Sequence, residues 1–363
     1  MPDCGARRRS RPCRASASLV RDAATEEERL IEALSEVLRQ VKLNGAAFLD
    51  AEFREPWCVV ARGRLCRLLM PDASHFIHYH YVAEGSCRIR TEDGRAETAI
   101  AAGDVVVFPN GDDHILGSDL RLAPGSIADV IRPPARGEVA RVQYGGDGAK
   151  TRLVCGFLAC DPQLCSPILS ALPPVFKINM RSSPSGDWLE RSLRHSVAEV
   201  ASPRAGADVI LARLSEVLFV EALRCYVESL PAEQRGWLAG LRDPYVGKGL
   251  KLLHGDAARA WTVDELAREV GCSRSILAER FTHFVGQPPI QYLTKWRLAL
   301  AASQLRSSGS RLAHVAERFG YESEAAFNRA FKREFGMPPA QWRRQQRGRS
   351  TPARHPRAGA DLV

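Results

Sequence analysis

The run GYESEAAFNRAFKREFGMP, Gly320 to Pro338, decides the fold of the C-terminal third of the chain. It combines a turn glycine, a serine suited to a helix N-cap, phenylalanines at helical spacing, a C-capping glycine and a proline. The same order of residue types occurs about fifty positions earlier, from Gly271 to Pro288. The sequence therefore contains one helical unit twice.

Each copy has the layout of a helix-turn-helix unit. A short amphipathic helix comes first, then a glycine turn, and then a second helix whose N-cap is Ser273 or Ser323. Phe281 and Phe331 mark the buried side of these second helices. We expect a helix over Ile290 to Arg306 to join the copies, and the Pro-Pro pairs after each copy to stop its second helix.

The opposite faces of the second helices are free to enter the major groove of DNA. Arg329 suits guanine, Glu279 suits cytosine N4, Asn328 suits adenine and Lys332 suits a phosphate. The alternative is that these are the solvated faces of a helical bundle. The predicted DNA-binding residues are Arg274, Ser275, Ala278, Glu279, Thr282, Ala325, Asn328, Arg329 and Lys332.

Charge supports the DNA interpretation. The chain has 363 residues and a net charge of +9, and residues 242–363 carry 21 Lys+Arg against 11 Asp+Glu. Residues 22–241 instead carry 24 against 30. A basic final third indicates a polyanionic partner, and the doubled helix-turn-helix unit indicates that this partner is double-stranded DNA bound with sequence specificity. Lys295, Arg297 and Arg306 on the joining helix are candidates for phosphate contacts, and the alternative for each is a solvated surface charge.

Two long segments of this third resemble a known family. WTVDELAREVGCSRSILAERFTHFVGQPPIQYLTKWRLALAASQL and RLAHVAERFGYESEAAFNRAFKREFGMPPAQWR are together similar to the tandem helix-turn-helix domain of AraC/XylS-type transcriptional regulators. The resemblance covers roughly residues 248–344 and implies a domain that binds promoter DNA. RNA polymerase would be a further partner if the protein is an activator.

The N-terminal part has a different pattern. Short apolar runs broken by Gly, Pro, Asn and Asp occupy about residues 46–157 and predict a β-sandwich or barrel, with a hairpin turn at Glu92 to Gly94. Helical spacing returns at about 188–197 and 209–230. The second of these segments is apolar over a wide stripe, which favours a homodimer contact beside the domain's own core.

Two segments of the β region, His78 to Gly85 and Gly103 to His114, resemble the two cupin motifs. Because strand side chains alternate, the two histidines and the glutamate of the first motif share one face, and the histidine of the second would come from a partner strand. Such a set suits a divalent transition metal. In the alternative, the barrel is metal-free and its lumen holds a small molecule. The metal hypothesis names His78, His80, Glu84 and His114.

The ten cysteines lack the spacing of a zinc ribbon or of a disulfide-stapled domain, so we expect reduced thiols in a cytosol. Cys155, Cys160 and Cys165 recur every five residues and are the candidates for a redox switch. Reactivity there would need a lowered thiol pKa, and buried, inert thiols are the alternative.

Together these patterns predict an α+β protein, with an N-terminal cupin-like antiparallel β-barrel with flanking helices and an all-α C-terminal domain of two joined helix-turn-helix units. The expected parts are a disordered basic tail (1–24), a sensor domain (25–175), a helical dimerisation or packing segment (176–230), a linker (231–247), the DNA-binding domain (248–344) and a second disordered basic tail (345–363).

The predicted function is sequence-specific transcriptional regulation, without enzymatic activity, in response to a small molecule, a metal or an oxidant. No apolar run approaches the length of a membrane span, so we expect a cytoplasmic protein with no membrane partner. The alternative is a metal-dependent cupin enzyme, such as a dioxygenase or isomerase, that carries a DNA-binding domain.

Overall fold

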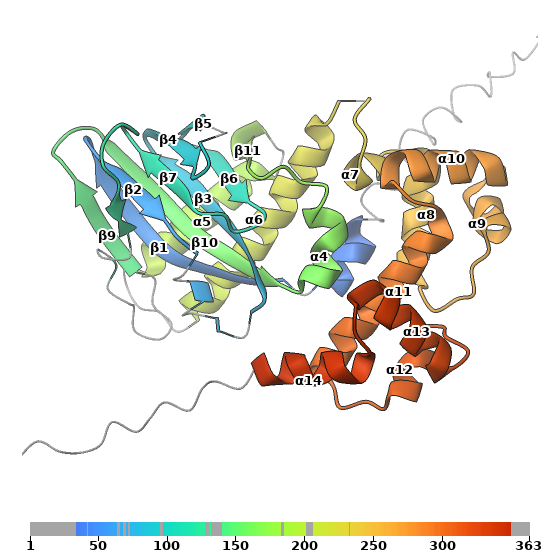
Figure 1. Cartoon of the computed structure of the whole chain (residues 1–363). Coiled ribbons are helices and arrows are strands. Elements are labelled where there is room, and N and C mark those ends of the chain that lie inside the picture. The colour runs from blue at the N-terminus through green and yellow to red at the C-terminus, as the bar shows by residue number, and fades with distance from the viewer. Residues whose placement is uncertain are drawn as a thin grey trace, which may run out of the picture.

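The structure is a computed structural model that describes residues 34–41, 43–63, 66–67, 70–71, 73–94, 97–127, 131, 140–182, 185–200, 206–231 and 233–349. A β-rich N-terminal domain lies beside a helical C-terminal domain (Figure 1), and we name them the sensor domain and the DNA-binding domain after the functions predicted above. The expected tail 1–24 and the part of the second tail beyond residue 349 lie outside the described residues. Within these residues, no helix has the length and apolar character to cross a membrane.

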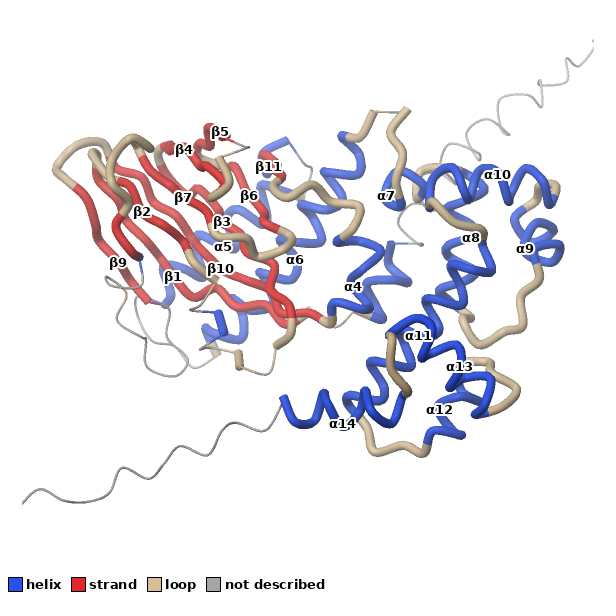
Figure 2. Tube along the Cα trace, viewed as in Figure 1, coloured by secondary structure: helices blue, strands red, loops and turns tan. Residues whose placement is uncertain are grey.

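Two β-sheets pack face to face in the sensor domain (Figure 2). The first has the order β11-β6-β3-β10-β1-β9 and the second β5-β4-β7-β2-β8. The strands of the first are β1 (Asn44–Arg54), β3 (His75–Glu84), β6 (Asp104–Phe108), β9 (Ala140–Gly145), β10 (Lys150–Cys160) and β11 (Phe176–Asn179). Those of the second are β2 (Cys58–Ala61), β4 (Ser86–Thr91), β5 (Glu97–Ala101), β7 (His114–Gly117) and β8 (Gly125–Ser126).

The predicted fold class is confirmed, with one difference in strand direction. Most neighbouring strands run antiparallel, including β4 and β5 around the expected hairpin turn. However, β1 pairs with β9 and β2 pairs with β8 in parallel. Both parallel pairs join strands far apart in sequence, because a parallel pair needs a long crossover connection. The sheets are therefore mixed rather than purely antiparallel.

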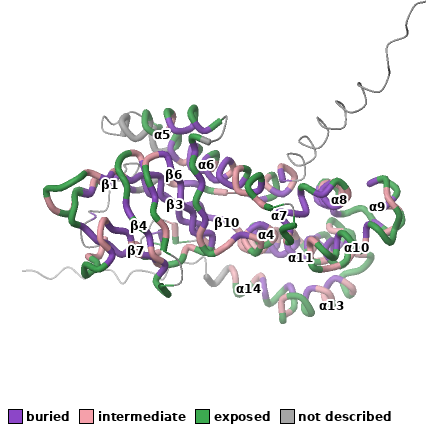
Figure 3. Tube along the Cα trace, turned by 90° about the horizontal axis from the view of Figure 1, so that it is seen from above, coloured by how far each residue is buried: buried purple, intermediate pink, exposed green. Residues whose placement is uncertain are grey.

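The central strand β3 separates two layers of core. Tyr79 and Tyr81 pack into the cluster that lies beneath α5 (Gly186–Val200) and α6 (Ala207–Ser229), whereas Val82 packs between the sheets. These two helices cover the outer face of the first sheet (Figure 3). At Gly45 of β1 an added Cβ would lie 2.3 Å from the Ala212 carbonyl oxygen, so α6 approaches the sheet backbone closely.

The DNA-binding domain is built around one long helix, α11 (Pro289–Ser307). Trp296 on this helix belongs to a core that continues into the sensor domain, while Leu305 belongs to a separate core under the second helix-turn-helix unit. The first unit consists of α9 (Val263–Val270) and α10 (Arg274–Val285), preceded by α8 (Pro244–Gly255). The second consists of α12 (Leu312–Arg318) and α13 (Glu324–Phe335), followed by α14 (Pro339–Arg349).

The segment expected as a linker, 231–247, is largely folded. Helix α7 (Trp237–Gly240) and the first turn of α8 lie within it, and Trp237 and Leu241 are buried. Burial of the apolar residues in this stretch stabilises the folded state more than its glycines and charged residues destabilise it. The sensor helix α4 (Pro162–Leu169) packs against α11, so the two domains are in direct contact.

Candidate DNA-binding interface and sensor site

The first recognition helix, α10, is held at both ends by the residues that its sequence supplies. Ser273 caps it by accepting a hydrogen bond from the Ile276 amide, and Gly286 ends it at φ 78°. In the preceding helix, Thr262 and Glu265 form a capping box. The register of α10 relative to α9 is thus fixed locally.

The second unit repeats this arrangement with a longer turn, residues 319–323 against residues 271–273 in the first. Ser323 caps α13 through the Ala326 amide, and Gly320 in the turn adopts φ 76°. A Cβ at Gly320 would lie 2.5 Å from the Ala258 carbonyl oxygen of the first unit. We expected the Pro-Pro pairs to stop the second helices, but Pro289 and Pro339 instead begin the next helices, α11 and α14. The first residue of a helix has no intrahelical partner for its amide, so proline fits there without the loss of a hydrogen bond.

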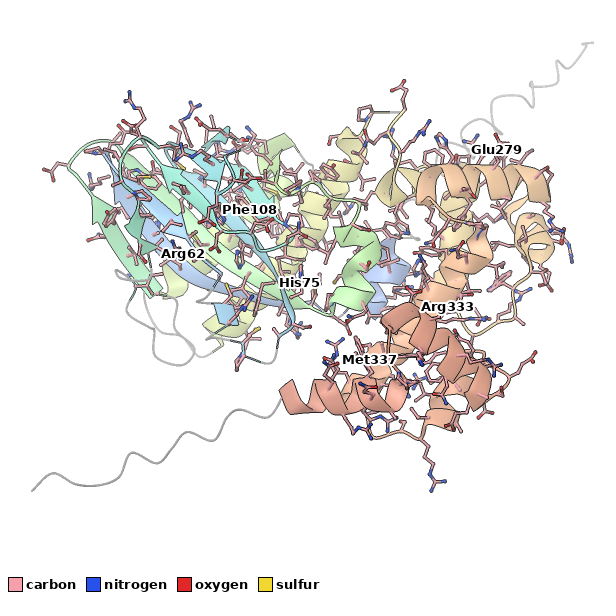
Figure 4. All side chains as sticks on the ribbon, viewed as in Figure 1. Arg62, His75, Phe108, Glu279, Arg333 and Met337 are labelled. Carbon is pink, nitrogen blue, oxygen red and sulfur yellow. The ribbon has the colours of Figure 1, made fainter. Side chains whose placement is uncertain are left out.

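All nine residues predicted to contact DNA lie on exposed or half-exposed parts of α10 and α13. Figure 4 shows Glu279 on the outer side of α10. The sequence interpretation missed Ile276, whose side chain is 45% exposed near the start of α10. The helical spacing of the sequence already places Ile276 outside the buried stripe of α10, which is the sign that it is exposed. An exposed apolar side chain at this position suits a contact with a thymine methyl group.

A buried carboxylate orients α10. Arg280 of α10 donates through Nε to Asp243 Oδ2 at 2.8 Å, and the Asp243 side chain is almost fully buried. The other carboxylate oxygen of Asp243 caps α8 by accepting from the amides of Tyr245 and Val246. Asp243 therefore ties the recognition helix to the first turn of α8.

Two of the three residues predicted to contact phosphates are used inside the protein. Arg297 is half-buried, and its Nη2 donates to the Arg259 carbonyl at 2.6 Å. Arg306 pairs with the sensor-domain residue Asp161, with Nη2 to Oδ2 at 2.7 Å. These two predictions are wrong because nearby acceptors hold both guanidinium groups, whereas Lys295 is exposed.

Inside the sensor domain, His80, His114 and Cys155 form a hydrogen-bonded chain. His114 Nδ1 lies 2.8 Å from the Asp112 carbonyl oxygen and must donate to it, which leaves His114 Nε2 as an acceptor. His80 Nε2, 2.6 Å away, then donates to it, and His80 Nδ1 accepts from the Cys155 thiol at 2.9 Å. Burial lowers the pKa of His114 to about 4 and that of His80 well below its usual range. Both imidazoles are therefore neutral.

The four predicted metal ligands do not assemble into a metal site. Glu84 is 56% exposed and pairs with Lys150 at 3.0 Å, because the end of β3 reaches the surface. His78 Nε2 lies 3.3 Å from Cys66 Sγ, while His80 and His114 bond to each other. Among the described residues, no group of three or more His, Cys, Asp or Glu side chains is placed to hold a metal. The residues present do not fit the expected metal.

The three cysteines considered for a redox switch are buried. Burial raises the pKa of the Cys155 thiol, and a hydrogen bond with Cys160 together with burial raises that of Cys165. Since the thiolate is the reactive form, these environments suppress the chemistry that a redox switch requires.

A cavity of about 430 Å³ opens at the barrel mouth, next to the DNA-binding domain. His75 and His78 of β3 contribute to its wall, together with Arg67 of the sensor domain. Arg306 of α11 and Gln346 of α14 line it from the DNA-binding domain. Figure 4 shows His75 at the end of the barrel that faces the helices. Both domains therefore share this cavity, whereas apolar side chains fill the space between the sheets.

Comparisons with known proteins agree with this two-domain architecture. Residues 32–228 match a family model described as a cupin, and residues 266–345 match one described as a helix-turn-helix domain. An AraC-like transcription regulator of Streptomyces lividans is 34% identical over 75% of this chain and 88% of its own length. The chain belongs to the AraC-type transcriptional regulators.

Two further comparisons span most of this AraC-type regulator. The transcriptional regulator AlkR of Acinetobacter baylyi is 29% identical over 87% of this chain and all of its own length. The crystal structure of ToxT from Vibrio cholerae O395 covers 85% of this chain and 99% of its own, at 11% identity and a TM-score of 0.33. The two family models and the relative from Streptomyces lividans identify this chain as a DNA-binding transcriptional regulator with a cupin-type N-terminal domain.

Proposed function

We propose that this protein regulates transcription by inserting α10 and α13 into promoter DNA, and that a small anionic molecule bound at the barrel mouth controls how these helices are presented. The observation that carries this proposal is the cavity lined by both domains. A ligand held by both walls binds one arrangement of the domains better than others, which is the requirement for allosteric control.

The charge of this cavity favours an anion. Arg67 contributes an exposed guanidinium group to its lining, which includes no Asp or Glu within the described residues, and the charge of Arg306, the other arginine of the lining, is compensated by its ion pair with Asp161. Ser74 and Asn110 add uncharged polar groups. Guanidinium groups bind carboxylates and phosphates in a bidentate manner, so a small carboxylate or phosphate ester fits this chemistry.

The experiment measures the affinity of the full-length protein for its promoter with and without a panel of small anions, such as succinate, benzoate and inorganic phosphate. We expect at least one anion to change promoter affinity severalfold in wild type and to lose this effect in Arg67→Ala. Arg121→Ala, which removes an exposed arginine paired with Asp119, serves as the control. A response that survives unchanged in Arg67→Ala would exclude this cavity as the effector site.

A homodimer is the second part of the proposal. Val209, Ile210 and Val217 of α6 are 57%, 48% and 43% exposed, and Trp188 of α5 is 59% exposed. Large exposed apolar side chains on neighbouring helices favour contact with a second copy. Analytical ultracentrifugation of wild type and of an Ile210→Glu, Val217→Glu double variant tests this. We expect the variant to sediment as a monomer at concentrations where wild type is dimeric.

We further propose that the protein acts in the cytoplasm, without enzymatic activity, and contacts RNA polymerase if it activates transcription. The supporting observations are that its curated relatives are named as regulators and that its histidine cluster is bonded internally rather than arranged around a metal. Turnover of a cupin substrate by the purified protein would contradict the absence of catalysis.

A further inference from the structure

Arg280 connects the first recognition helix to the segment that joins the two domains. Its guanidinium group donates from both Nε and Nη2 to Asp243 Oδ2, and its Cζ lies 5.8 Å from the centre of the Tyr245 ring. Asp243 is the N-cap of α8, and Tyr245 lies in the first turn of that helix. On α10, Arg280 lies between the exposed Glu279, which is predicted to read DNA, and the buried Phe281. The contact is therefore made directly beside the face of α10 that is expected to enter the major groove.

Asp243 is a fixed anchor for this contact. Its side chain is 1% exposed, and its backbone amide and carbonyl are bonded to the Gly240 carbonyl and the Gly247 amide. The neighbouring Arg242 donates from Nη1 to the carbonyl oxygen of Leu230, the C-cap of α6, at 2.6 Å. Two adjacent residues thus bind the end of α6 and the recognition helix α10. A charge-assisted hydrogen bond to a buried carboxylate holds its partner more firmly than an exposed, neutral one.

The second recognition helix has no equivalent of this bridge at the corresponding positions. Phe281 of α10 corresponds to Phe331 of α13, so the position of Arg280 is taken by Ala330, whose side chain has no donor. The helix that precedes the second unit, α11, has Pro288 as its N-cap, without a side-chain hydrogen bond, in place of the aspartate that caps α8. The segment between the domains is therefore bonded to α10 by a route that α13 lacks.

We propose that Asp243 is a positioning residue for DNA recognition, which acts through Arg280 to fix the orientation of α10. Base reading by α10 then depends on this pair, whereas base reading by α13 does not. The proposal rests on the proposed insertion of both helices into promoter DNA. Base contacts require side chains placed within about 0.5 Å of the productive geometry. A small rotation of α10 after loss of the pair is therefore enough to disturb all of its base contacts at once.

The alternative is that the exposed part of Arg280 binds a DNA phosphate directly. The Arg280 side chain is 45% exposed, so its geometry permits this role. A phosphate contact is lost in Arg280→Gln, with a drop of about one in the salt-dependence slope, but it survives in Asp243→Asn. A positioning pair instead gives the same loss of base preference from either side, and the double variant loses no more than one single variant.

The test begins with the full-length protein and a randomised DNA library, which yield the preferred duplex with its two half-sites. Glu279→Ala identifies the half-site that α10 reads, because base preference relaxes there. Anisotropy titrations then use this duplex and two versions with one half-site scrambled. We expect Asp243→Asn and Arg280→Gln each to weaken binding to the intact duplex about tenfold. Neither should weaken binding to the duplex whose α10 half-site is scrambled.

Two further variants separate positioning from a general loss of stability. Arg280→Lys keeps the charge and should recover part of the affinity lost in Arg280→Gln. Asp50→Asn is the matched control, because Asp50 is a buried carboxylate of the sensor domain that accepts from Arg152 Nε and Nη2 at 2.9 and 2.8 Å. This substitution breaks a pair of the same kind outside the DNA-binding domain. It should lower the stability to urea and leave the affinities for all three duplexes unchanged.

Equal affinities of wild type and Asp243→Asn would overturn the proposal, and so would losses of equal size on all three duplexes, which indicate a general loss of folded structure. A reduced salt slope in Arg280→Gln alone would assign Arg280 to a phosphate and overturn it as well. If Glu279→Ala relaxes base preference while Asp243→Asn does not, only the positioning role fails. If Glu279→Ala changes no base preference, the insertion of α10 into DNA fails, and the positioning role fails with it.

Discussion

Arg306 of the DNA-binding domain and Asp161 of the sensor domain form an ion pair with Nη2 to Oδ2 at 2.7 Å. Asp161 is also the N-cap of α4, where it accepts from the Gln163 amide, and the Gln163 side chain accepts from the same Arg306 guanidinium. The residue that starts the sensor's contact helix thus also binds the last turn of α11. At this point the two domains are therefore connected by an ion pair and a hydrogen bond from the same guanidinium group.

A double-mutant cycle measures this connection. Arg306→Gln and Asp161→Asn should show a coupling energy of about 1 kcal/mol in urea unfolding, since the pair is mostly shielded from solvent. The Arg121 and Asp119 pair, whose arginine is 90% exposed, is the control and should show no measurable coupling. Additive effects of the two interdomain substitutions would mean that the contact contributes nothing to domain docking.

Arg329→Ala should relax base specificity. The side chain is exposed on α13 and suits guanine, so its loss should cost about 1–3 kcal/mol at one base pair and little elsewhere. Lys332→Ala should instead weaken binding to all sequences alike and reduce the salt dependence. Selection from a randomised DNA library, followed by anisotropy titrations, separates these outcomes. An unchanged base preference in Arg329→Ala would remove Arg329 from the predicted interface.

The histidine chain predicts a loss of stability in mild acid. Burial lowers the pKa of His114 to about 4 from an unfolded value of 6.5, so the unfolded state takes up a proton between these values and the folded state does not. Stability is therefore full above about pH 6.5 and falls as the pH drops toward 4, with about 2 kcal/mol lost from His114 alone by about pH 5. Urea titrations at about pH 7 and about pH 5 measure this loss.

His114→Gln should reduce this pH dependence by the share of His114 and leave the rest, because burial also lowers the pKa of His78, His80 and His254. The exposed His283 of α10 supplies the control, and His283→Gln should keep the wild-type slope. If His114→Gln loses as much stability as wild type over the same interval, the acid sensitivity arises elsewhere, for example at His254, whose pKa burial lowers to about 3.

Two turn glycines should respond differently to alanine. Gly271→Ala meets open space but positive φ, so it should cost about 1 kcal/mol. Gly320→Ala adds a contact with the Ala258 carbonyl oxygen and should cost about 2–3 kcal/mol. Thermal unfolding of the two variants gives the comparison. Equal costs would show that the two units do not meet closely at Gly320.

Zinc or nickel should not raise the melting temperature of the purified protein. His80 and His114 already satisfy each other, and Glu84 lies with Lys150 at the surface. Thermal melts with stoichiometric metal and with a chelator test this. A rise of several degrees with metal, lost in His80→Gln, would show that the histidines rearrange into a binding site.

The DNA-binding half was predictable because its signals are local. Capping serines, left-handed glycines and the phenylalanine stripes each act within a few residues, so the sequence states them directly. The helix that joins the units and the exposed faces of α10 and α13 follow from the same periodicity. The roles of Arg297 and Arg306 were not predictable, because their acceptors lie between 38 and 232 residues away in the chain, and those of Arg306 depend on how the domains dock.

In the sensor domain, too, local features were predictable from the sequence and long-range contacts were not. Strand periodicity placed His78 and His80 on one face, and both are buried. Whether Glu84 lies near these histidines depends on where β3 leaves the sheet. The two-residue alternation of side chains along a strand does not determine that point. The cavity at the barrel mouth and the partner of each histidine nitrogen arise from long-range packing, so no motif spacing contains them.

Strand β10 is bonded to β1 along one edge and to β3 along the other, and it passes into α4 through Asp161 alone. Side chains inside the barrel can therefore be exchanged during evolution while the strand and its end stay in place. The two hydrogen-bonded edges of β10, rather than the side chains between the sheets, therefore set where α4 begins and where it meets α11.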